Sequence, residues 1–283
     1  MFYTDAQLKA EMARCEFCEE KPCKTGCPCD CSPADFIRAA SGFKPSDFKR
    51  AAGIILSSNP LGGVCGSVCP DYHCQARCTR EDFDTPVNIP AIQATIIKKA
   101  KELGQLPQFI RPASNGKKIA VIGAGPAGLG AATALIQMGY DVSVYEPEQL
   151  GGQANLIPEQ RLEPGVMDSD LAYIAEAFGL KPITQTPPTA KELLAGGNAA
   201  VIVATGLTNP IHLGIPGDEY IHYGLDILKN PAGFDFSGKR IAVVGGAIAA
   251  DQALTVALNG AAYVEMICLE SYPEMPLTPE EKA

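Results

Sequence analysis

The sequence predicts a helical, cysteine-rich N-terminal domain followed by α/β nucleotide-binding domains with parallel sheets. Ten of the eleven cysteines precede residue 79, in a region whose other stretches are typical of helices. Beyond about residue 117, apolar strands alternate with helices across glycine-rich turns, which is typical of a parallel sheet with crossover helices. We therefore expect three domains: a helical domain over 1–112, a nucleotide-binding domain over 113–235, and a partial second one over 236–283.

Four helices are expected in the first hundred residues, each from a residue that can cap its N-terminus. The first runs to about Arg14. The second follows Ser32, which precedes a proline suited to a first helical position, and the third begins at about Ser46. The fourth begins at Asn88 and ends before Gly104, a residue that favours the left-handed turn after a helix.

After a linker rich in Pro, Gly and Ser, LPQFIRPASNG, the pattern changes to strand, turn and helix. KKIAVIG predicts a buried strand, PAGLGAATALIQMG a helix, and DVSVYE a second strand. NAAVIVATG predicts a further strand. A second copy of the unit starts at Lys239, about 120 residues beyond the first, and reads KRIAVVGG, AIAADQALTVALNG and YVEMICLE.

The composition excludes several classes of function. Lys and Arg number 23 against 32 Asp and Glu, a net charge of -9, so no basic surface for nucleic acid or an anionic membrane is expected. The stretch MFYTDAQLKAEMARC lacks the apolar core of a secretory signal, and no apolar run approaches the ~18 residues that span a membrane. We expect a cytoplasmic protein, and in that reducing compartment eleven cysteines do not indicate a disulfide framework.

The cysteines form two groups, CEFCEEKPCKTGCPCDC from residue 15 and CGSVCPDYHCQARC from residue 65. A structural zinc site commonly uses two CxxC pairs, and only Cys15 and Cys18 have that spacing. Proline follows Cys27 and Cys69, an arrangement typical of cubane clusters. The pattern favours iron–sulfur clusters over zinc, but the spacing does not decide which cysteines act together.

This pattern, with the downstream stretch PVNIPAIQ, resembles the N-terminal domain of a flavoprotein family. The family includes the small subunit of bacterial glutamate synthase, the N-terminal part of dihydropyrimidine dehydrogenase, and NADH-dependent ferredoxin:NADP oxidoreductase. The resemblance extends from about residue 10 to the end of the chain. It implies two [4Fe-4S] clusters, each with ligands from both cysteine groups. The first cluster would use Cys15, Cys18, Cys23 and Cys78.

The resemblance also implies that the second cluster has one ligand that is not cysteine. Its ligands would be Cys27, Cys69, Cys74 and Gln93. Gln93 lies where dihydropyrimidine dehydrogenase has a glutamine ligand; the alternative is a helix surface residue. The other cysteines are Cys29 and Cys31, either of which could be an alternative ligand, Cys65, expected as a buried small residue, and Cys268, expected to pack in a core strand.

The stretch GAGPAG matches GxGxxG between a predicted strand and a predicted helix, and Glu146 ends the next strand about 20 residues later. This context is typical of a Rossmann-like dinucleotide site. The glycine at the third position of the motif permits a pyrophosphate to approach the helix N-terminus, and the glycine at the sixth position lets helix and strand pack closely. The turn residues expected at the dinucleotide are Gly123, Gly125, Pro126, Ala127 and Gly128, with Glu146 accepting hydrogen bonds from a ribose. Spacing alone leaves FAD and NAD open.

The family resemblance favours FAD at this turn. LGGQANLIPEQRL matches the family's stretch that lies along the flavin, and NAAVIVATG resembles the strand and turn that close such sites. The contacts that this implies are Gly151, Gly152, Gln153, Arg161, Thr205 and Gly206. The alternative is a nucleotide-binding fold without a bound cofactor.

The second turn, VVGGAIAAD, resembles the family's NAD(P)-binding turn but departs from it. Gly245 and Gly246 are followed by Ala247 where the family usually has a third glycine, and the added methyl group crowds a pyrophosphate. Glu270 stands near the position where relatives that prefer NADPH carry arginine. An acidic residue there suits a ribose 2′-OH and repels a 2′-phosphate, so NADH is favoured if the site binds. The alternative is a turn that no longer binds nicotinamide well.

The resemblance implies an electron-transfer subunit of an oxidoreductase complex that uses NAD(H), FAD and two [4Fe-4S] clusters. The flavin would do the chemistry, so no side chain is needed as nucleophile or general base. The alternative function is a non-catalytic relay or assembly subunit that holds clusters and FAD but no nicotinamide. Because the chain ends early in the second nucleotide-binding domain, a partner polypeptide is expected to complete that domain or to supply the catalytic subunit. The sequence does not identify this partner.

Overall fold

The computed structural model describes residues 2–207 and 209–282. The chain forms two compact units, one of Met1–Asn155 with Glu159–Gly206 and one of Leu156–Pro158 with Leu207–Ala283. The cysteine-rich helices and the first glycine-rich turn therefore belong to the same unit. The finer division into three domains stays a prediction.

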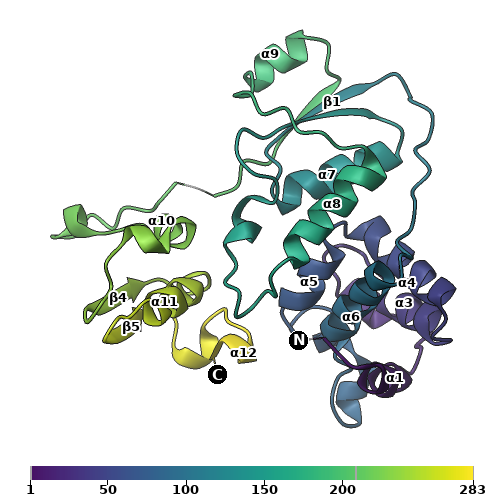
Figure 1. Ribbon diagram of the computed structural model, residues 1–283, viewed down its shortest axis with the longest axis horizontal. Helices are drawn as coiled ribbons and strands as arrows, with labels where there is room; N and C mark the ends of the chain where they lie inside the picture. Colours follow the sequence, from purple (N-terminus) through teal and green to yellow (C-terminus); the bar gives the residue numbers. More distant parts are fainter. Residues whose placement is uncertain (1, 208, 283) are drawn as a thin grey trace. The chain divides into compact units, whose positions relative to one another are not determined.

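The N-terminal part of the first unit is helical, as predicted (Figure 1). The four expected helices are confirmed: Thr4 caps the first, Ser32 and Asn88 precede the second and the fourth, and the third begins at Pro45. Two further short helices were not predicted. The helices are α1 (Asp5–Ala13), α2 (Pro22–Thr25), α3 (Pro33–Ala40), α4 (Pro45–Ser58), α5 (Gly62–Val68) and α6 (Ile89–Glu102), with 3-10 turns at Gln75–Arg77 and Thr79–Asp82.

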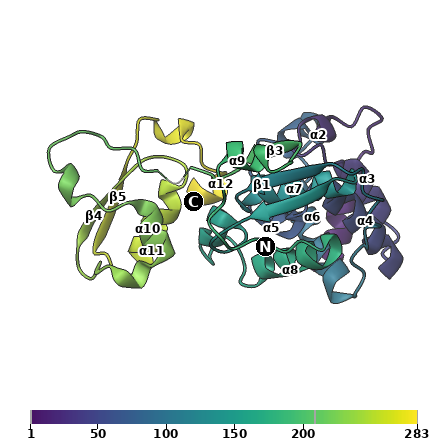
Figure 2. The same cartoon turned by 90° about the horizontal axis from the view of Figure 1, so that it is seen from above.

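The rest of the first unit is a three-stranded parallel sheet with flanking helices. Its strands are β1 (Lys118–Ile122), β2 (Asp141–Tyr145) and β3 (Ala200–Val203), in the order β2-β1-β3. Its helices are α7 (Pro126–Gln137), α8 (Val166–Phe178) and α9 (Ala190–Ala195), with a 3-10 turn at Gly152–Leu156. Helices α7 and α8 lie between the sheet and the N-terminal helices, and α5 lies beside α8 in both views (Figures 1 and 2).

Helix α5 forms despite three glycines, each of which disfavours a helix by roughly 1 kcal/mol relative to alanine. A Cβ atom at Gly66 would lie 2.5 Å from the backbone nitrogen of Ala94 on α6. A Cβ atom at Gly63 would lie 2.9 Å from the carboxylate of Asp170 on α8. Close packing on both sides therefore stabilises this helix. The apolar core around it includes Phe36, Phe48, Ile55, Ile92, Ile96 and Ile97, all almost fully buried.

The second unit contains a two-stranded parallel sheet of β4 (Arg240–Val244) and β5 (Tyr263–Ile267). Helices α10 (Gly224–Lys229), α11 (Ala249–Leu258) and α12 (Pro279–Lys282) accompany it, with 3-10 turns at Asp218–Tyr220, Pro231–Gly233 and Tyr272–Glu274. Its core consists of Ile227, Phe236, Val243, Ala249 and Val256.

The prediction for Cys268 was wrong, because β5 ends at Ile267. Cys268 is half-exposed just beyond the strand, and its thiol donates to the carbonyl oxygen of Glu270 over 3.3 Å.

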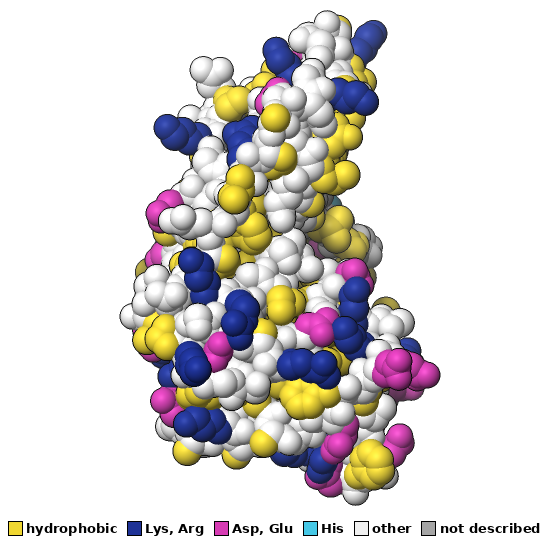
Figure 3. Space-filling view, turned by 90° about the vertical axis from the view of Figure 1, so that its right-hand side faces the viewer, with side chains coloured by type: hydrophobic (Ala, Val, Ile, Leu, Met, Phe, Trp, Pro, Cys, Tyr) yellow, Lys and Arg dark blue, Asp and Glu magenta, His cyan; other side chains and the backbone are white. Residues whose placement is uncertain are grey.

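On the face in Figure 3, side chains of lysine and arginine and of acidic residues are scattered among apolar and uncharged polar groups. Within the described ranges, no single helix is long and apolar enough to cross a membrane; only the bent pair of α4 and α5 passes such a test, on length and composition alone.

Candidate functional site

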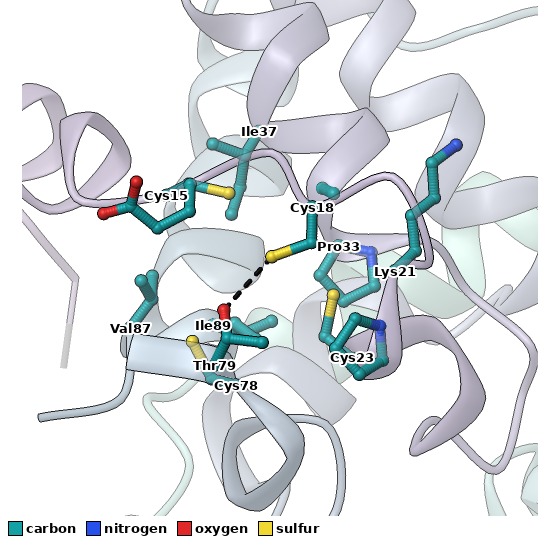
Figure 4. Close-up of a pocket in the computed structure, with 13 residues that line it drawn as sticks. Cys15, Cys18, Lys21, Cys23, Pro33, Ile37, Cys78, Thr79, Val87 and Ile89 are labelled. Carbon is teal, nitrogen blue, oxygen red and sulfur yellow. Dashed lines mark hydrogen bonds between the residues drawn. The ribbon is translucent and has the colours of Figure 1, made fainter. Parts of the chain in front are cut away.

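Four cysteine side chains from the two sequence groups line one pocket in the first unit. Cys15 follows α1, Cys18 and Cys23 come from the loop and helix after it, and Cys78 comes from the second group. Figure 4 shows their sulfur atoms arranged around a common space. The structure thus brings together the four residues predicted for the first cluster, although up to 63 residues separate them in sequence.

Contacts between the two cysteine groups hold this pocket in place. Thr79 Oγ1 lies 3.1 Å from the Cys18 sulfur (Figure 4), a contact that the sequence did not suggest. Arg80 pairs with Glu16 at 2.6 Å. A Cβ atom at Gly26 would lie 2.7 Å from the Arg77 side chain, so the first loop packs directly on the second. The pairing of the groups is therefore part of the fold.

The arrangement fits a cluster. Among residues 2–207 and 209–282, no three His, Cys, Asp or Glu side chains converge tightly enough to hold a single metal ion. Instead the thiols of the first set surround a space lined by apolar groups, including Ile37, Val87 and Ile89. A cubane places its own irons and sulfides between its cysteine ligands, and apolar surroundings with few hydrogen bonds help to set its potential.

The three cysteines predicted for the second cluster are also neighbours. Burial, together with the charges of Cys65 and Cys27, raises the pKa of Cys69 to about 11. Burial, together with the charges of Cys69 and Cys27, raises the pKa of Cys74 to about 12. A hydrogen bond from the Cys29 thiol lowers the pKa of Cys27 to about 6. The pKa values of Cys69 and Cys74 both depend on Cys27, so the three thiols lie close together.

Gln93 lies on α6 where that helix packs against α5. Its amide nitrogen donates to the carbonyl oxygen of Gly62 over 2.9 Å, and its side chain is half-buried. With the nitrogen held in this way, the amide oxygen is the remaining group that can act as an acceptor or ligand. This environment is more constrained than that of a surface residue, but the ligand role stays a prediction.

The remaining cysteines of the N-terminal region differ in burial. Cys29 is exposed, and its free thiol is hydrogen-bonded to Cys27. Cys31 is 2% exposed directly before α3, and burial raises its pKa to about 12. Cys65 is half-buried on α5, where burial raises its pKa. Its thiol interacts with the side chain of Asn59.

The first glycine-rich turn joins β1 to α7 at the carboxyl edge of the sheet. Gly123 has φ +100°, and its N–H donates to the Tyr145 carbonyl over 2.8 Å. A Cβ atom at Gly128 would overlap the Gly123 carbonyl oxygen, whereas one at Gly125 would meet only Gly152 Cα, at 4.0 Å. The turn is therefore closed on the protein side and open in front of Gly125, where a Cβ atom would occupy the place of a phosphate.

The other predicted flavin contacts surround this turn. The Glu146 carboxylate accepts from the N–H of Ala124 over 2.8 Å and keeps acceptor positions for a ribose. Gly151 donates to the Ala124 carbonyl over 2.8 Å, and Thr205 follows β3 beside Gly123. The remaining predicted contacts are Gly152 and Gln153 in the 3-10 turn, Arg161, half-buried in the loop before α8, and Gly206, which has φ +74°.

The second turn follows β4 in the second unit and has a related backbone. The N–H of Gly245 donates to the Ile267 carbonyl over 2.9 Å. Ala247 has φ +35°, a left-handed conformation that alanine rarely adopts. The Glu270 carboxylate lies close to this turn, 3.4 Å from a Cβ atom placed at Gly246. The predicted residues are thus brought together, with a strained residue at the position where a glycine was expected.

Comparison with known proteins decides the family. Residues 1–105 match the family described as dihydropyrimidine dehydrogenase domain II, 4Fe-4S cluster, and residues 117–280 match the pyridine nucleotide-disulphide oxidoreductase family. The chain belongs to these oxidoreductases. The fold class, the enzyme class and the cofactor set of FAD, [4Fe-4S] and NAD(H) that the resemblance implied are confirmed at the level of the family.

Individual relatives are subunits of oxidoreductases. The chain is 34% identical over 290 residues to the NAD-dependent dihydropyrimidine dehydrogenase subunit PreT of Escherichia coli K12, which covers 99% of this chain and 69% of the relative. It is 30% identical over 273 residues to the NADPH-Fe(3+) oxidoreductase subunit beta of Geobacter sulfurreducens, covering 90% of this chain and 39% of the relative. One relative is named for NAD and the other for NADPH, so these names do not decide the nucleotide.

Proposed function

We propose that this chain is the electron-transfer subunit of a cytoplasmic oxidoreductase, which passes electrons between NAD(H), FAD and two [4Fe-4S] clusters to or from a partner subunit. When bound, FAD accepts or donates a hydride and exchanges single electrons with the clusters. The chain's own residues bind and orient these groups. Cys15, Cys18, Cys23 and Cys78 would hold the first cluster, and Cys27, Cys69, Cys74 and Gln93 the second.

One observation carries this proposal: four thiols from two distant cysteine groups line one pocket in the same compact unit as the open GxGxxG turn. Cluster ligands and a dinucleotide turn in one compact unit are what electron transfer between a flavin and a cluster requires. A structural metal site would have no need of the turn, and a simple nucleotide-binding protein would have no need of the thiols.

The experiment is metal analysis of anaerobically prepared protein and of Cys78→Ser. Two cubanes predict about eight irons and eight acid-labile sulfides per chain. Cys78→Ser should lose up to about four of each, because Cys78 lines the pocket with Cys15. Cys268→Ser is the matched control, since Cys268 lies beyond β5 in the other unit, and it should lose none. About four irons in the wild-type protein, stoichiometric zinc, or an intact iron content in Cys78→Ser would contradict the proposal.

A second candidate function is a relay subunit that holds the clusters and FAD but no nicotinamide. The strained Ala247 favours it, because this residue stands where a pyrophosphate would approach the second turn. Anaerobic addition of NADH to the FAD-loaded protein separates the two: bleaching of the flavin absorbance supports the electron-transfer subunit, and no bleaching with NADH or NADPH supports the relay.

Exposed apolar side chains in the second unit support a protein partner. Val244 is 56% exposed, Ile267 is 53% exposed, and Leu269 just beyond β5 is fully exposed. We propose that a partner polypeptide covers this surface, between about Lys239 and the C-terminus. Cross-linking in protein purified from its native source should place the partner on these residues. A stable monomer without such cross-links would contradict this part of the proposal.

A further inference from the structure

The buried carboxylate of Asp170 on α8 caps the helix that leads to the second cysteine group. Asp170 is 1% exposed, and its Oδ2 accepts from the backbone N–H groups of Gly63 and Val64, both over 2.9 Å. Its Oδ1 accepts from Lys101 Nζ on α6 over 2.6 Å. One side chain therefore joins α8 to both α5 and α6. No sequence motif marked it.

Helix α8 also supports the segment that contacts the first glycine-rich turn. The side chain of Met167, one turn before Asp170, packs under Gly151, where a Cβ atom would overlap its terminal methyl group. Gly151 in turn donates to the carbonyl of Ala124 in the glycine-rich turn. Met167 and Asp170 thus place α8 in contact with the predicted flavin segment and with α5.

On the other side, α5 leads directly to a predicted ligand of the second cluster. Cys69 follows its last residue and donates its N–H to the Cys65 carbonyl over 2.8 Å. Cys69 lies five positions after Val64, which corresponds to a helical rise of about 7.5 Å. Gln93, the predicted fourth ligand, donates to Gly62 at the start of the same helix. The Asp170 carboxylate is therefore roughly 10 Å along this helix from the backbone of Cys69.

We propose that Asp170 is a positioning residue that couples the flavin-binding part to the second cluster: it fixes α5, and its ion pair with the partly exposed Lys101 sets the electrostatic potential at that cluster. This inference rests on the proposed function, because it requires the second cluster. Removing one charge of the pair leaves the other uncompensated in a poorly solvated place, where its field is strong.

The sign of each effect follows from the charge that remains. Asp170→Asn keeps the shape and leaves the Lys101 ammonium unpaired, so one-electron reduction of the second cluster becomes easier and its midpoint potential rises. Lys101→Met leaves the carboxyl unpaired, and because burial raises the pKa of Asp170, the potential falls only in titrations at a pH high enough to keep that carboxyl ionised. The double variant carries no charge, and its potential should return close to that of the wild-type protein. A role in folding alone predicts no such reversal.

The test is an anaerobic redox titration of the reconstituted protein, followed by electron paramagnetic resonance, with deazaflavin photoreduction for the lowest potentials. Cys78→Ser identifies the signal of the second cluster, because it damages only the first. Asp168→Asn is the matched control, since Asp168 is exposed on the same helix and loses the same charge. The first cluster serves as an internal reference in every variant.

The expected result, in titrations at a pH that keeps the Asp170 carboxyl ionised, is opposite shifts of the second cluster in the two single variants, cancellation in the double variant, and no shift in Asp168→Asn. Selective loss of the second cluster in Asp170→Asn, with the first retained, would also support the proposal. Unshifted potentials, equal shifts of both clusters, or loss of both clusters together would overturn it. Fewer than about eight irons in the wild-type protein would instead contradict the proposed function, so the two failures are distinguishable.

Discussion

Both glycine-rich turns connect a strand to a helix, but they differ in how much room they leave in front of the helix N-terminus. In each, the first glycine donates to the last residue of the neighbouring strand, Tyr145 in one and Ile267 in the other. The first turn has glycine at its third and sixth positions, and the second has Ala247 and Ala250. Helix α7 starts three residues after Gly123, whereas α11 starts four residues after Gly245.

This difference shows that a strand–turn–helix unit can fold without being an ideal phosphate site. In the first turn, the glycine at the sixth position lets α7 begin directly against the Gly123 carbonyl. In the second turn, the sixth position is Ala250, the helix starts one residue later, and Ala247 has a left-handed backbone conformation. The fold tolerates both turns, because the strand hydrogen bonds are the same. What changes is how closely a pyrophosphate can approach the helix N-terminus.

The largest expected effect comes from Gly128→Ala. The new Cβ atom overlaps the Gly123 carbonyl, which is backbone and cannot turn aside, so we expect a loss of about 3 kcal/mol in the free energy of unfolding and loss of FAD. Thermal unfolding and flavin content measure this. The matched change at the corresponding position, Ala250→Gly, should cost only about 1 kcal/mol through chain entropy. Equal stability of Gly128→Ala and wild type would show that the two turns are alike.

Gly125→Val should separate binding from folding. A side chain at Gly125 meets no protein atom closer than Gly152 Cα at 4.0 Å, so the stability of the cofactor-free protein should change by less than about 1 kcal/mol. FAD affinity should fall roughly 100-fold, because charge-assisted hydrogen bonds to the pyrophosphate are lost. Titration of cofactor-free protein with FAD measures this. Gly130→Ala, with open space around it on α7, is the control and should bind FAD normally. Unchanged FAD affinity in Gly125→Val would mean that the site lies elsewhere.

The next effect is on nucleotide preference at the second turn. Glu270→Gln removes the charge that we expect to repel a 2′-phosphate, so the preference for NADH over NADPH should fall by about fivefold, a modest change because the group is exposed and screened. Rates of flavin reduction with each nucleotide measure this. Glu265→Gln removes an equal charge from an exposed position within β5 and should leave the preference unchanged. A wild-type preference for NADPH would contradict our interpretation of Glu270.

The sequence predicted elements that carry a local signal and missed those that depend on tertiary contacts. The capping positions Thr4, Ser32 and Asn88 predicted three of the helices, and the glycine spacing predicted both turns. Helix α5 was missed because its three glycines have low helix propensity, and only its packing against α6 and α8 compensates. Helix α8 was not predicted either, and neither was Asp170. The hydrogen bonds of Asp170 are made with residues about 70 to 107 positions away in the sequence, so no local pattern marks it.

The cysteine pairing shows the same limit. Spacing indicated clusters but could not join Cys15 to Cys78; the family resemblance supplied that pairing, and the pocket brings the two together. Cys268 was misplaced because an apolar run does not mark where a strand stops pairing, and β5 ends one residue earlier.

The smallest expected effect, and the most direct test of the comparison, comes from Ala247→Gly. Alanine at φ +35° carries a conformational cost of about 1 kcal/mol, which glycine removes, but glycine also gains entropy in the unfolded chain. The two effects nearly offset, so the free energy of unfolding should rise by no more than about 0.5 kcal/mol. The lost methyl group should lower the Kd for NADH by about threefold, since the backbone becomes accessible to a pyrophosphate.

The control is Ala250→Gly, which relieves no left-handed residue. It should destabilise the protein and leave the Kd for NADH unchanged. Calorimetric unfolding and NADH titration of both variants decide between a turn that is merely strained and one that has lost its ligand. If Ala247→Gly gains no affinity, the methyl group is not what separates the second turn from the first.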